Sequence, residues 1–493
     1  MKHLLLLTLL CLIVNSCQFM EVMQEEKRHT FADELADLKA YYQIPGMAVM
    51  VMDGREVVYE DYIGKANIEA GRPVTSGTHF PIASITKLFS AVLVHRLHER
   101  GKLNLTDAVN KYLDESTLND SIQIQHLLSH TSEGRIGEQF HYSSRFALLT
   151  QVIEKSSGRT FSDLMRSDIL VPTGMNETYL PADASEAEPY RNITATGYRY
   201  DGTLATCAVE YGYSASAGIV SSARDLARFQ QALLTDSLLL QYSKELIFTP
   251  FKKGLPYGQG IFTQELMDEK ILWAYGQYDC YSSLLIMVPE EDLTFILLAN
   301  NNLTSDPARL INGDVTTSLF AVSFLKNFVY GKSRLPLLET ESGLAKVKPE
   351  GPLYRRKLLA QAMAEAYMSR YDTSRFSLGL GLLDKLFTYY PKTEAYASLN
   401  LMHTLSYLNT VAQHHQLTYP AYLNDKMQDA GSTLLQEQPD NPYLHIYLAD
   451  YYDRTGDLIQ AAYHYRWLAE ATAFSDNWYT AEAKSWLEKN EDY

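Results

Sequence analysis

The sequence predicts an α/β (α+β) domain with one antiparallel sheet flanked by helices and a helical insertion, followed by an all-α region. Short apolar runs at 46–52 and 57–63 surround Asp53-Gly54, a pattern typical of a β-hairpin. Similar runs return within 270–299, whereas the segment between them carries mainly helical patterns. Strands at both ends with helices between them favour one sheet built from both ends of the domain.

The length of 493 residues suggests two or three domains. We expect a first domain at 28–332, a linker rich in Pro, Gly and mixed charges at 333–352, and a helical domain at 353–493. Part of the last resembles a tetratricopeptide unit with its turn at Gly456-Asp457, and a generic helical bundle is the alternative. The residues at the matching spacing are Leu448, Ala449, Tyr452, Ala461, Tyr465 and Leu468.

Residues 1–17 have the features of an export signal. Lys2 gives a basic start, and an apolar run at 4–14, too short to span a bilayer, precedes Cys17. This segment resembles a bacterial lipoprotein signal, which implies that Cys17 becomes the lipid anchor; simple secretion is the alternative. We therefore expect an exported protein held in the cell envelope, at the periplasm or outer membrane, by acyl chains.

The charge balance argues against nucleic acid as a partner. The chain has 43 Lys and Arg against 59 Asp and Glu, a formal net charge of −16. Such a surface repels phosphate groups, and no basic stripe with interleaved aromatic residues offsets this repulsion.

Two cysteines, Cys207 and Cys280, remain in the body of the protein. We favour two buried free thiols. A disulfide outside the cytoplasm is the alternative, because sequence alone cannot show that the two residues meet.

Ser84 and Lys87 have the spacing of a nucleophile and its base. They lie three residues apart at the start of a predicted helix, so the two side chains share a face. A hydroxyl needs a base to remove its proton, and a desolvated lysine can serve as that base. The S-x-x-K pattern alone is weak, because an exposed lysine at a helix start also produces it.

Further motifs give this pair a context. In order and spacing they resemble the serine beta-lactamase-related family, which includes class C beta-lactamases, D-alanyl-D-alanine peptidases and esterases. The resemblance covers roughly residues 30–332 and implies a beta-lactamase-like transpeptidase fold. The motifs are Pro81 to Lys87, Gly101 to Asp107, His126 to Ser132, His141 to Ser144, Val152 to Glu154 with Gly158, Pro172 to Met175, and Gly218 to Leu226.

The resemblance implies a role for each matching residue. Ser84 is the nucleophile, Lys87 the base, and Tyr142 the group that passes a proton to the leaving group. A phenol with an ordinary pKa is a poor base at neutral pH, so we expect the Lys87 cation to lower the pKa of Tyr142. The N–H groups of Ser84 and Gln277 would form the oxyanion hole, with Gly276 allowing close backbone approach.

Two positions depart from the family pattern. Ser144 stands where the family usually has an asparagine that holds the lysine and the substrate amide. Ala274 replaces the cationic residue of the third motif. Loss of that cation predicts weaker binding of substrate carboxylates and favours esters or amides over beta-lactams.

The sequence therefore predicts an exported serine hydrolase that forms an acyl-enzyme on an amide, peptide or ester, with weak or no beta-lactamase activity. The alternative is a catalytically degenerate penicillin-binding-like module that serves as an envelope binding or scaffold protein. We expect no cofactor and no metal; His126 and His130 are interpreted as structural. The C-terminal helices are expected to be separable and to dock a protein partner, so that deleting them leaves Ser84 reactivity nearly intact.

Overall fold

The structure is a computed structural model that describes residues 27–115, 118–235, 237–332, 334–346, 351–475 and 477–490. The signal segment, its anchor Cys17 and part of the expected linker lie outside the described residues. Among the residues described, no helix combines the length and apolarity needed to cross a bilayer.

Seven antiparallel strands form the central sheet, in the order β3-β2-β1-β11-β10-β9-β8. Strand β1 pairs with β11, with Met47 opposite Ala299, so the two ends of the domain meet at the centre of the sheet. This confirms the predicted sheet. Its strands are β1 (Gly46–Asp53), β2 (Glu56–Asn67), β3 (Arg72–Pro73), β8 (Phe262–Leu266), β9 (Glu269–Tyr278), β10 (Tyr281–Val288) and β11 (Leu293–Ala299). Two smaller sheets pair β4 (Phe80–Pro81) with β7 (Val220–Ser221) and β5 (Gly197–Tyr200) with β6 (Leu204–Cys207).

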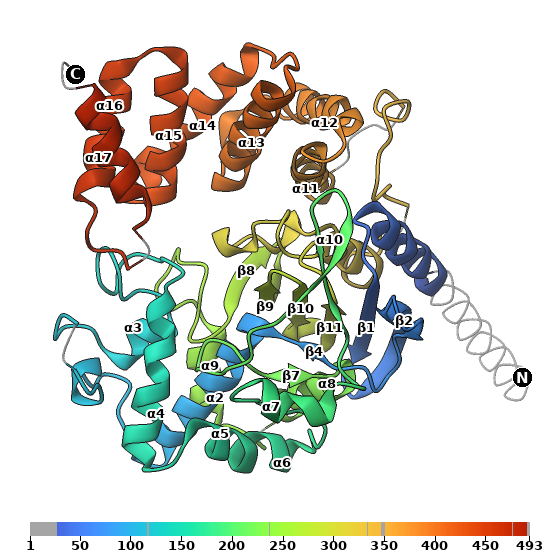
Figure 1. Cartoon of the computed structure of the whole chain (residues 1–493), viewed down its shortest axis with the longest axis vertical. Helices are drawn as coiled ribbons and strands as arrows, with labels where there is room; N and C mark the ends of the chain where they lie inside the picture. The colour runs from blue at the N-terminus through green and yellow to red at the C-terminus, as the bar shows by residue number, and fades with distance from the viewer. Residues whose placement is uncertain are drawn as a thin grey trace, which may run out of the picture.

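Helices cover both faces of the sheet (Figure 1). In β1, Ala48 and Met50 pack towards the helical insertion, and Met47 and Val49 pack towards the opposite layer. Because both faces are covered, the strand is a nearly continuous apolar run. Helical residues 27–41 and α10 (Leu319–Phe324) form the opposite layer. The insertion contains α2 (Thr86–Glu99), α3 (Ile124–Leu128), α4 (Leu149–Ser157), α5 (Phe161–Leu164), α6 (Val171–Thr173), α7 (Ala184–Ala187), α8 (Ala223–Leu234) and α9 (Gln241–Phe248).

The C-terminal region is all helical, as predicted, and lies over one end of the sheet domain (Figure 1). In α15 and α16, Ala449 and Ala461 are fully buried in one small core, and Gly456 ends α15 in the left-handed conformation. Close packing at these two alanines was expected; the tetratricopeptide interpretation stays a prediction. The helices are α11 (Gly351–Ser369), α12 (Phe376–Tyr389), α13 (Leu399–His415), α14 (Tyr422–Glu437), α15 (Pro442–Thr455), α16 (Leu458–Glu470) and α17 (Tyr479–Lys489).

Helix α11 packs against both parts of the molecule. Its Leu353, Ala360 and Ala364 belong to the core beneath the sheet, whereas Tyr354 and Leu358 belong to the core of the C-terminal helices. The predicted boundary near residue 353 therefore falls at a helix that shares its side chains between two cores.

The described part of the expected linker is anchored rather than free. Glu339 is buried and accepts hydrogen bonds from Lys357 and Lys385, each at 2.7 Å. Burial acts to raise the pKa of Glu339, but the two lysines and the Tyr354 hydroxyl together outweigh it and hold that pKa below its usual value. A buried charge requires such partners, so this segment has a defined place between the two cores.

Cys207 and Cys280 form a disulfide, with their Cα atoms 5.9 Å apart. The favoured interpretation of two free thiols is therefore wrong. The β5–β6 hairpin ends at Cys207 and lies against the turn between β9 and β10, which brings together residues 73 apart in the chain. Only the tertiary fold shows this proximity.

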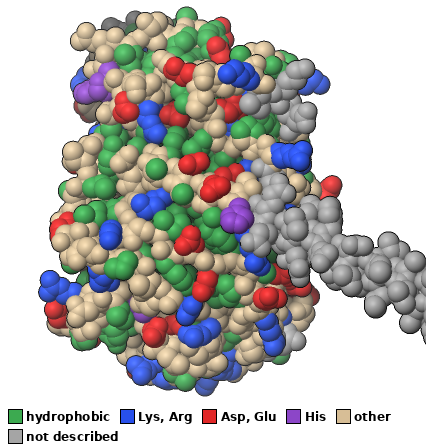
Figure 2. Space-filling view, turned by 90° about the vertical axis from the view of Figure 1, so that its right-hand side faces the viewer, with side chains coloured by type: hydrophobic (Ala, Val, Ile, Leu, Met, Phe, Trp, Pro, Cys, Tyr) green, Lys and Arg blue, Asp and Glu red, His purple; other side chains and the backbone are tan. Residues whose placement is uncertain are grey.

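The surface mixes charges of both signs. On the face shown in Figure 2, Lys and Arg side chains are interspersed with Asp and Glu side chains. A polyanion approaching this face would meet repulsion beside each attraction.

Candidate active site

Ser84 lies in a 3-10 turn, η1 (Ala83–Ile85), that leads directly into α2. Ala83 has a φ of 46°, in the left-handed region that is costly for a residue with a Cβ atom. Strand β9 holds this turn from the side: a Cβ atom on Gly276 would meet the carbonyl oxygen of Ile82 at 2.1 Å. Gly276 therefore lies at a close approach between β9 and the turn that carries Ser84.

Lys87 is buried beside Ser84. Its Nζ is 2.9 Å from Ser84 Oγ and donates a second hydrogen bond of 3.2 Å to the carbonyl oxygen of Ser216. Burial lowers the pKa of Lys87 to about 7. At neutral pH a large fraction of this amine is uncharged and able to accept a proton.

Tyr142 completes the cluster. Its hydroxyl shares a hydrogen bond with Ser84, and Lys87 Nζ is 5.0 Å from the centroid of its ring. Burial raises the pKa of Tyr142, and the bond to Ser84 only partly opposes this effect. The expected lowering of this pKa by Lys87 is wrong, because desolvation disfavours the phenolate and also favours a neutral Lys87.

The cluster opens into a cleft of about 730 Å³. Among the described residues, its lining has two carboxylate side chains, Glu210 and Asp279, and no Lys, Arg or His. The lining residues are Ser84, Tyr142, Ala208, Val209, Glu210, Tyr275, Gln277, Tyr278, Asp279 and Cys280. The walls therefore offer aromatic surface and negative charge to a bound molecule.

The structure separates the other predicted site residues. Gln277 lines the cleft, and its Nε2 donates to Asp306 Oδ1 at 3.0 Å. Ala274 is 6% exposed and packs in the core on the helical side of the sheet. Ser144 is outside the cleft lining, and its Oγ is 3.2 Å from Ser475 Oγ in the C-terminal region.

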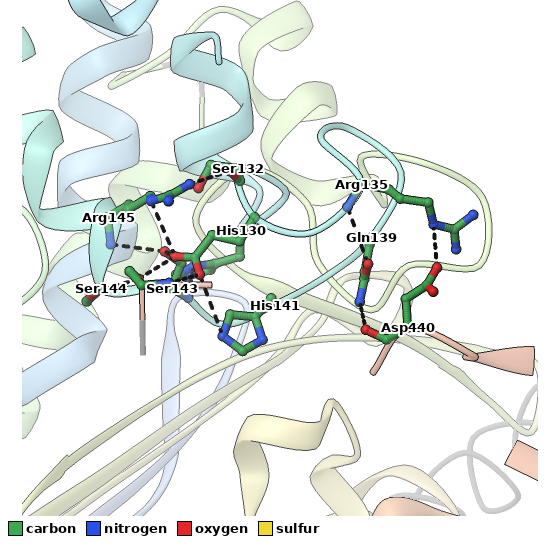
Figure 3. A network of polar contacts seen from close by, with 11 residues as sticks. His130, Ser132, Arg135, Gln139, His141, Ser143, Ser144, Arg145 and Asp440 are labelled. Atoms are coloured by element: carbon green, nitrogen blue, oxygen red, sulfur yellow. Dashed lines mark hydrogen bonds and ion pairs between the residues drawn. The ribbon is translucent and has the colours of Figure 1, made fainter. Parts of the chain in front are cut away.

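Figure 3 shows a polar network that includes His130, Ser143 and Arg145. The ring of His130 stacks on that of Tyr142 with centroids 4.2 Å apart, and its Nδ1 accepts the Ser143 N–H at 2.9 Å. The Ser143 hydroxyl donates to Glu133. Sequence reasoning missed Glu133, which directly follows the recognised motif ending at Ser132, because a carboxylate beyond a motif is usually exposed.

The histidine pair has structural contacts. His126 Nδ1 accepts the N–H of Gln123 at 3.1 Å and so caps α3, while His130 supports Tyr142. Within the part of the chain that the structure describes, no three His, Cys, Asp or Glu side chains gather as metal ligands would.

Known proteins resemble the part of the chain that carries this cluster. Residues 31–315, more than half of the chain, match the family model described as Beta-lactamase. Penicillin-binding protein 4* of Bacillus subtilis is 28% identical over 331 residues, which cover 56% of this chain and 73% of that protein. Protein flp of Staphylococcus aureus is 24% identical over 305 residues, covering 52% of this chain and 60% of flp.

A solved structure shows the same fold. The octameric penicillin-binding protein homologue from Pyrococcus abyssi aligns with a TM-score of 0.56 and 24% identity, covering 67% of this chain and 80% of that one. At this identity the likeness supports the fold alone.

Proposed function

Because this chain belongs to the beta-lactamase family, we propose that it is a serine hydrolase that forms an acyl-enzyme on Ser84. The observation that carries the proposal is the buried Lys87 amine, 2.9 Å from the Ser84 hydroxyl and with a pKa of about 7. A base with that pKa at that distance suits proton removal at neutral pH.

Acylation begins when neutral Lys87 takes the proton of Ser84. The Ser84 oxygen forms a bond to the substrate carbonyl carbon, and the π electron pair moves onto the carbonyl oxygen. We assign the N–H groups of Ser84 and Gln277 to this oxyanion, since the contact of Gly276 with Ile82 brings their backbones together.

Collapse of the tetrahedral intermediate breaks the bond to the leaving group. Tyr142 is protonated at neutral pH and bonded to Ser84, so it is placed to donate its proton to the departing nitrogen or oxygen. The Lys87 ammonium then returns a proton to Tyr142. Water, activated by the same groups, releases the acyl product and restores Ser84.

The substrate we propose is a neutral or cationic ester, amide or peptide, with weak or no beta-lactam hydrolysis. Ala274 supplies no cation, and the cleft lining contains Glu210 and Asp279. A substrate carboxylate would lose its water there without gaining a positive partner.

We also propose that the protein is exported and anchored through Cys17. The disulfide between Cys207 and Cys280 supports this location, because disulfides persist in oxidising compartments outside the cytoplasm. Globomycin sensitivity of processing and metabolic labelling with palmitate would test it. A protein that remains unlabelled and releases freely after lysis of the outer membrane would contradict the lipid anchor.

Covalent labelling tests the catalytic proposal. A fluorophosphonate or a small activated ester should modify the wild-type chain at Ser84, located by peptide mass spectrometry, and Ser84→Ala should remove the label. If a folded wild-type protein resists every acylating probe, the degenerate binding module, which the changes at Ala274 and Ser144 favour, becomes the better proposal.

A further inference from the structure

The C-terminal region contacts the segment that carries Tyr142 from behind (Figures 1 and 3). Ser475, in the loop between α16 and α17, donates its N–H to Glu133 Oε2 and its hydroxyl to Glu133 Oε1, each at 2.6 Å. Glu133 is 1% exposed, whereas Ser475 is an exposed residue, so these bonds are partly buried. A buried carboxylate depends strongly on each partner, and Ser475 supplies two hydrogen bonds.

Glu133 transmits this contact to Tyr142. Its carboxylate also accepts from the Ser143 hydroxyl and lies 3.6 Å from Arg145 Nε. The Ser143 N–H bonds to His130, whose ring stacks on Tyr142. Glu133 thus holds Ser143, which follows Tyr142 in the chain and bonds to the His130 ring that stacks on Tyr142.

Further contacts hold the same segment against the C-terminal helices. The buried Phe474 ring lies with its centroid 4.7 Å from that of His141. Gln139 Nε2 donates to the carbonyl oxygen of Asp440 at 2.7 Å, and Arg135 pairs with the Asp440 carboxylate at 3.0 Å. These contacts fix the segment that carries Tyr142 at Arg135 and Gln139 on one side and at His141 on the other.

A second connection reaches Gln277, another residue of the cleft lining. Tyr367 in α11 donates to Asp306 Oδ2 at 2.7 Å, and Asp306 Oδ1 accepts from the Gln277 side chain at 3.0 Å. Gln277 is the residue whose N–H we assign to the oxyanion. The C-terminal region is therefore linked to the surroundings of Tyr142 through Glu133, and to the Gln277 side chain through Asp306.

We propose that the C-terminal helical region positions the catalytic groups: Ser475 acts on Tyr142 through Glu133, and Tyr367 acts on Gln277 through Asp306. Ser475 and Tyr367 are positioning residues for the hydrolase reaction, and the inference rests on the proposed function. These contacts argue against the expectation that deleting the helices leaves Ser84 reactivity nearly intact. The hydrolase domain and its C-terminal helices form one catalytic unit.

Four single substitutions in the full chain test this inference. Ser475→Ala removes one bond to Glu133, and Tyr367→Phe removes one bond to Asp306. The matched control is Tyr41→Phe, which removes another tyrosine hydroxyl that crosses to α11; Tyr41 packs against the same core as Tyr367 but is bonded to Glu365, at 2.7 Å, rather than to Asp306. Acylation of Ser84 by a saturating activated ester is measured by stopped flow, together with half-saturation and thermal unfolding.

We expect Ser475→Ala and Tyr367→Phe to slow the maximal acylation rate about tenfold with little change in half-saturation, because displacement of a catalytic group lowers the rate of the chemical step. Ser475→Thr retains the hydroxyl and should restore the rate, and Tyr41→Phe should acylate like the wild type.

Each result has a distinct meaning. Equal acylation by all variants and the wild type overturns the inference while leaving the proposed hydrolase intact. Equal losses in all variants, Tyr41→Phe included, in parallel with lower melting temperatures also overturn it, because the interface would then act only on stability. A wild-type chain that no probe acylates contradicts the proposed function itself.

Discussion

The two walls of the cleft are built in different ways. Ser84 and Lys87 lie one helical turn apart, so a few residues of backbone and the start of α2 place the nucleophile 2.9 Å from its base. Tyr142 comes from a loop and Gln277 from the end of β9, and each is supported by a carboxylate that bonds to the C-terminal region. The first wall is a local construction, whereas the second depends on tertiary contacts.

This difference separates chemistry from positioning. A helical turn brings Ser84 and Lys87 together wherever the helix forms. The Gln277 N–H, which stabilises the oxyanion, and Tyr142, which protonates the leaving group, must be aligned with that pair by tertiary packing. Substitution of Ser84 or Lys87 should remove a group that takes part in the chemistry. Substitution of Ser475 or Tyr367 should instead displace Tyr142 or Gln277.

The largest effect is expected at Lys87. Lys87→Ala removes the base and should slow acylation of Ser84 about 10³-fold, within the range for loss of a general base. Lys87→Arg should lose as much, because a guanidinium stays charged and cannot accept the proton. Stopped-flow acylation with an activated ester measures both rates, and circular dichroism checks the fold. Near-normal acylation by Lys87→Arg would show that another group takes the proton.

Tyr142→Phe should produce the next largest loss, roughly 10²-fold for an amide. The phenylalanine retains the stacking on His130 and removes only the hydroxyl bonded to Ser84. An ester with a nitrophenolate leaving group needs little protonation, so its acylation rate should fall much less. Comparing kcat/KM for matched amide and ester substrates measures this difference, and equal losses on both would contradict the role as proton donor.

The pH dependence of the acylation rate should follow the ionisation of Lys87. Burial lowers the pKa of Lys87 to about 7, and the amine must be neutral to accept a proton. Acylation should therefore fall about tenfold per unit as pH decreases below 7, and level off above it. Burial raises the pKa of Tyr142, so its ionisation should cause no loss between pH 7 and 9. A rate that falls instead as pH rises through 7 would require a protonated Lys87.

The sequence predicted the local features of the molecule well. Alternating and continuous apolar runs located strands at both ends of the first domain, and the S-x-x-K spacing located Ser84 and Lys87. These features depend on residues close together in the chain, where periodicity determines which side chains share a face.

The long-range features could not be predicted in this way. Glu133 and Ser475 are 342 residues apart, and the disulfide joins Cys207 to a residue 73 positions away. Spacing within a segment carries no information about such pairs. The lowered pKa of Lys87 likewise arises from burial, and the same burial reversed the expected shift of Tyr142.

The smallest expected effect concerns Ala274 and the charge of the substrate. Ala274→His puts a partly cationic side chain in β9 two residues before Gly276, at a position that is 6% exposed and outside the cleft lining; that lining has no Lys, Arg or His among the described residues. A positive group there should improve kcat/KM for a substrate carboxylate about three- to tenfold, in keeping with the gain from one charge-assisted bond. The neutral methyl ester of the same substrate should gain nothing.

The control for this substitution is Ala274→Gln, which adds comparable bulk without charge to a position that is 6% exposed. Measuring kcat/KM for the acid and its ester with both variants separates charge from packing. The improvement with Ala274→His relative to wild type should grow as pH falls from 8 to 5, since burial lowers the pKa of an imidazole and only its protonated form carries the charge. If the acid gains as much from Gln as from His, the missing cation does not set substrate preference, and the carboxylates Glu210 and Asp279 become the groups to replace.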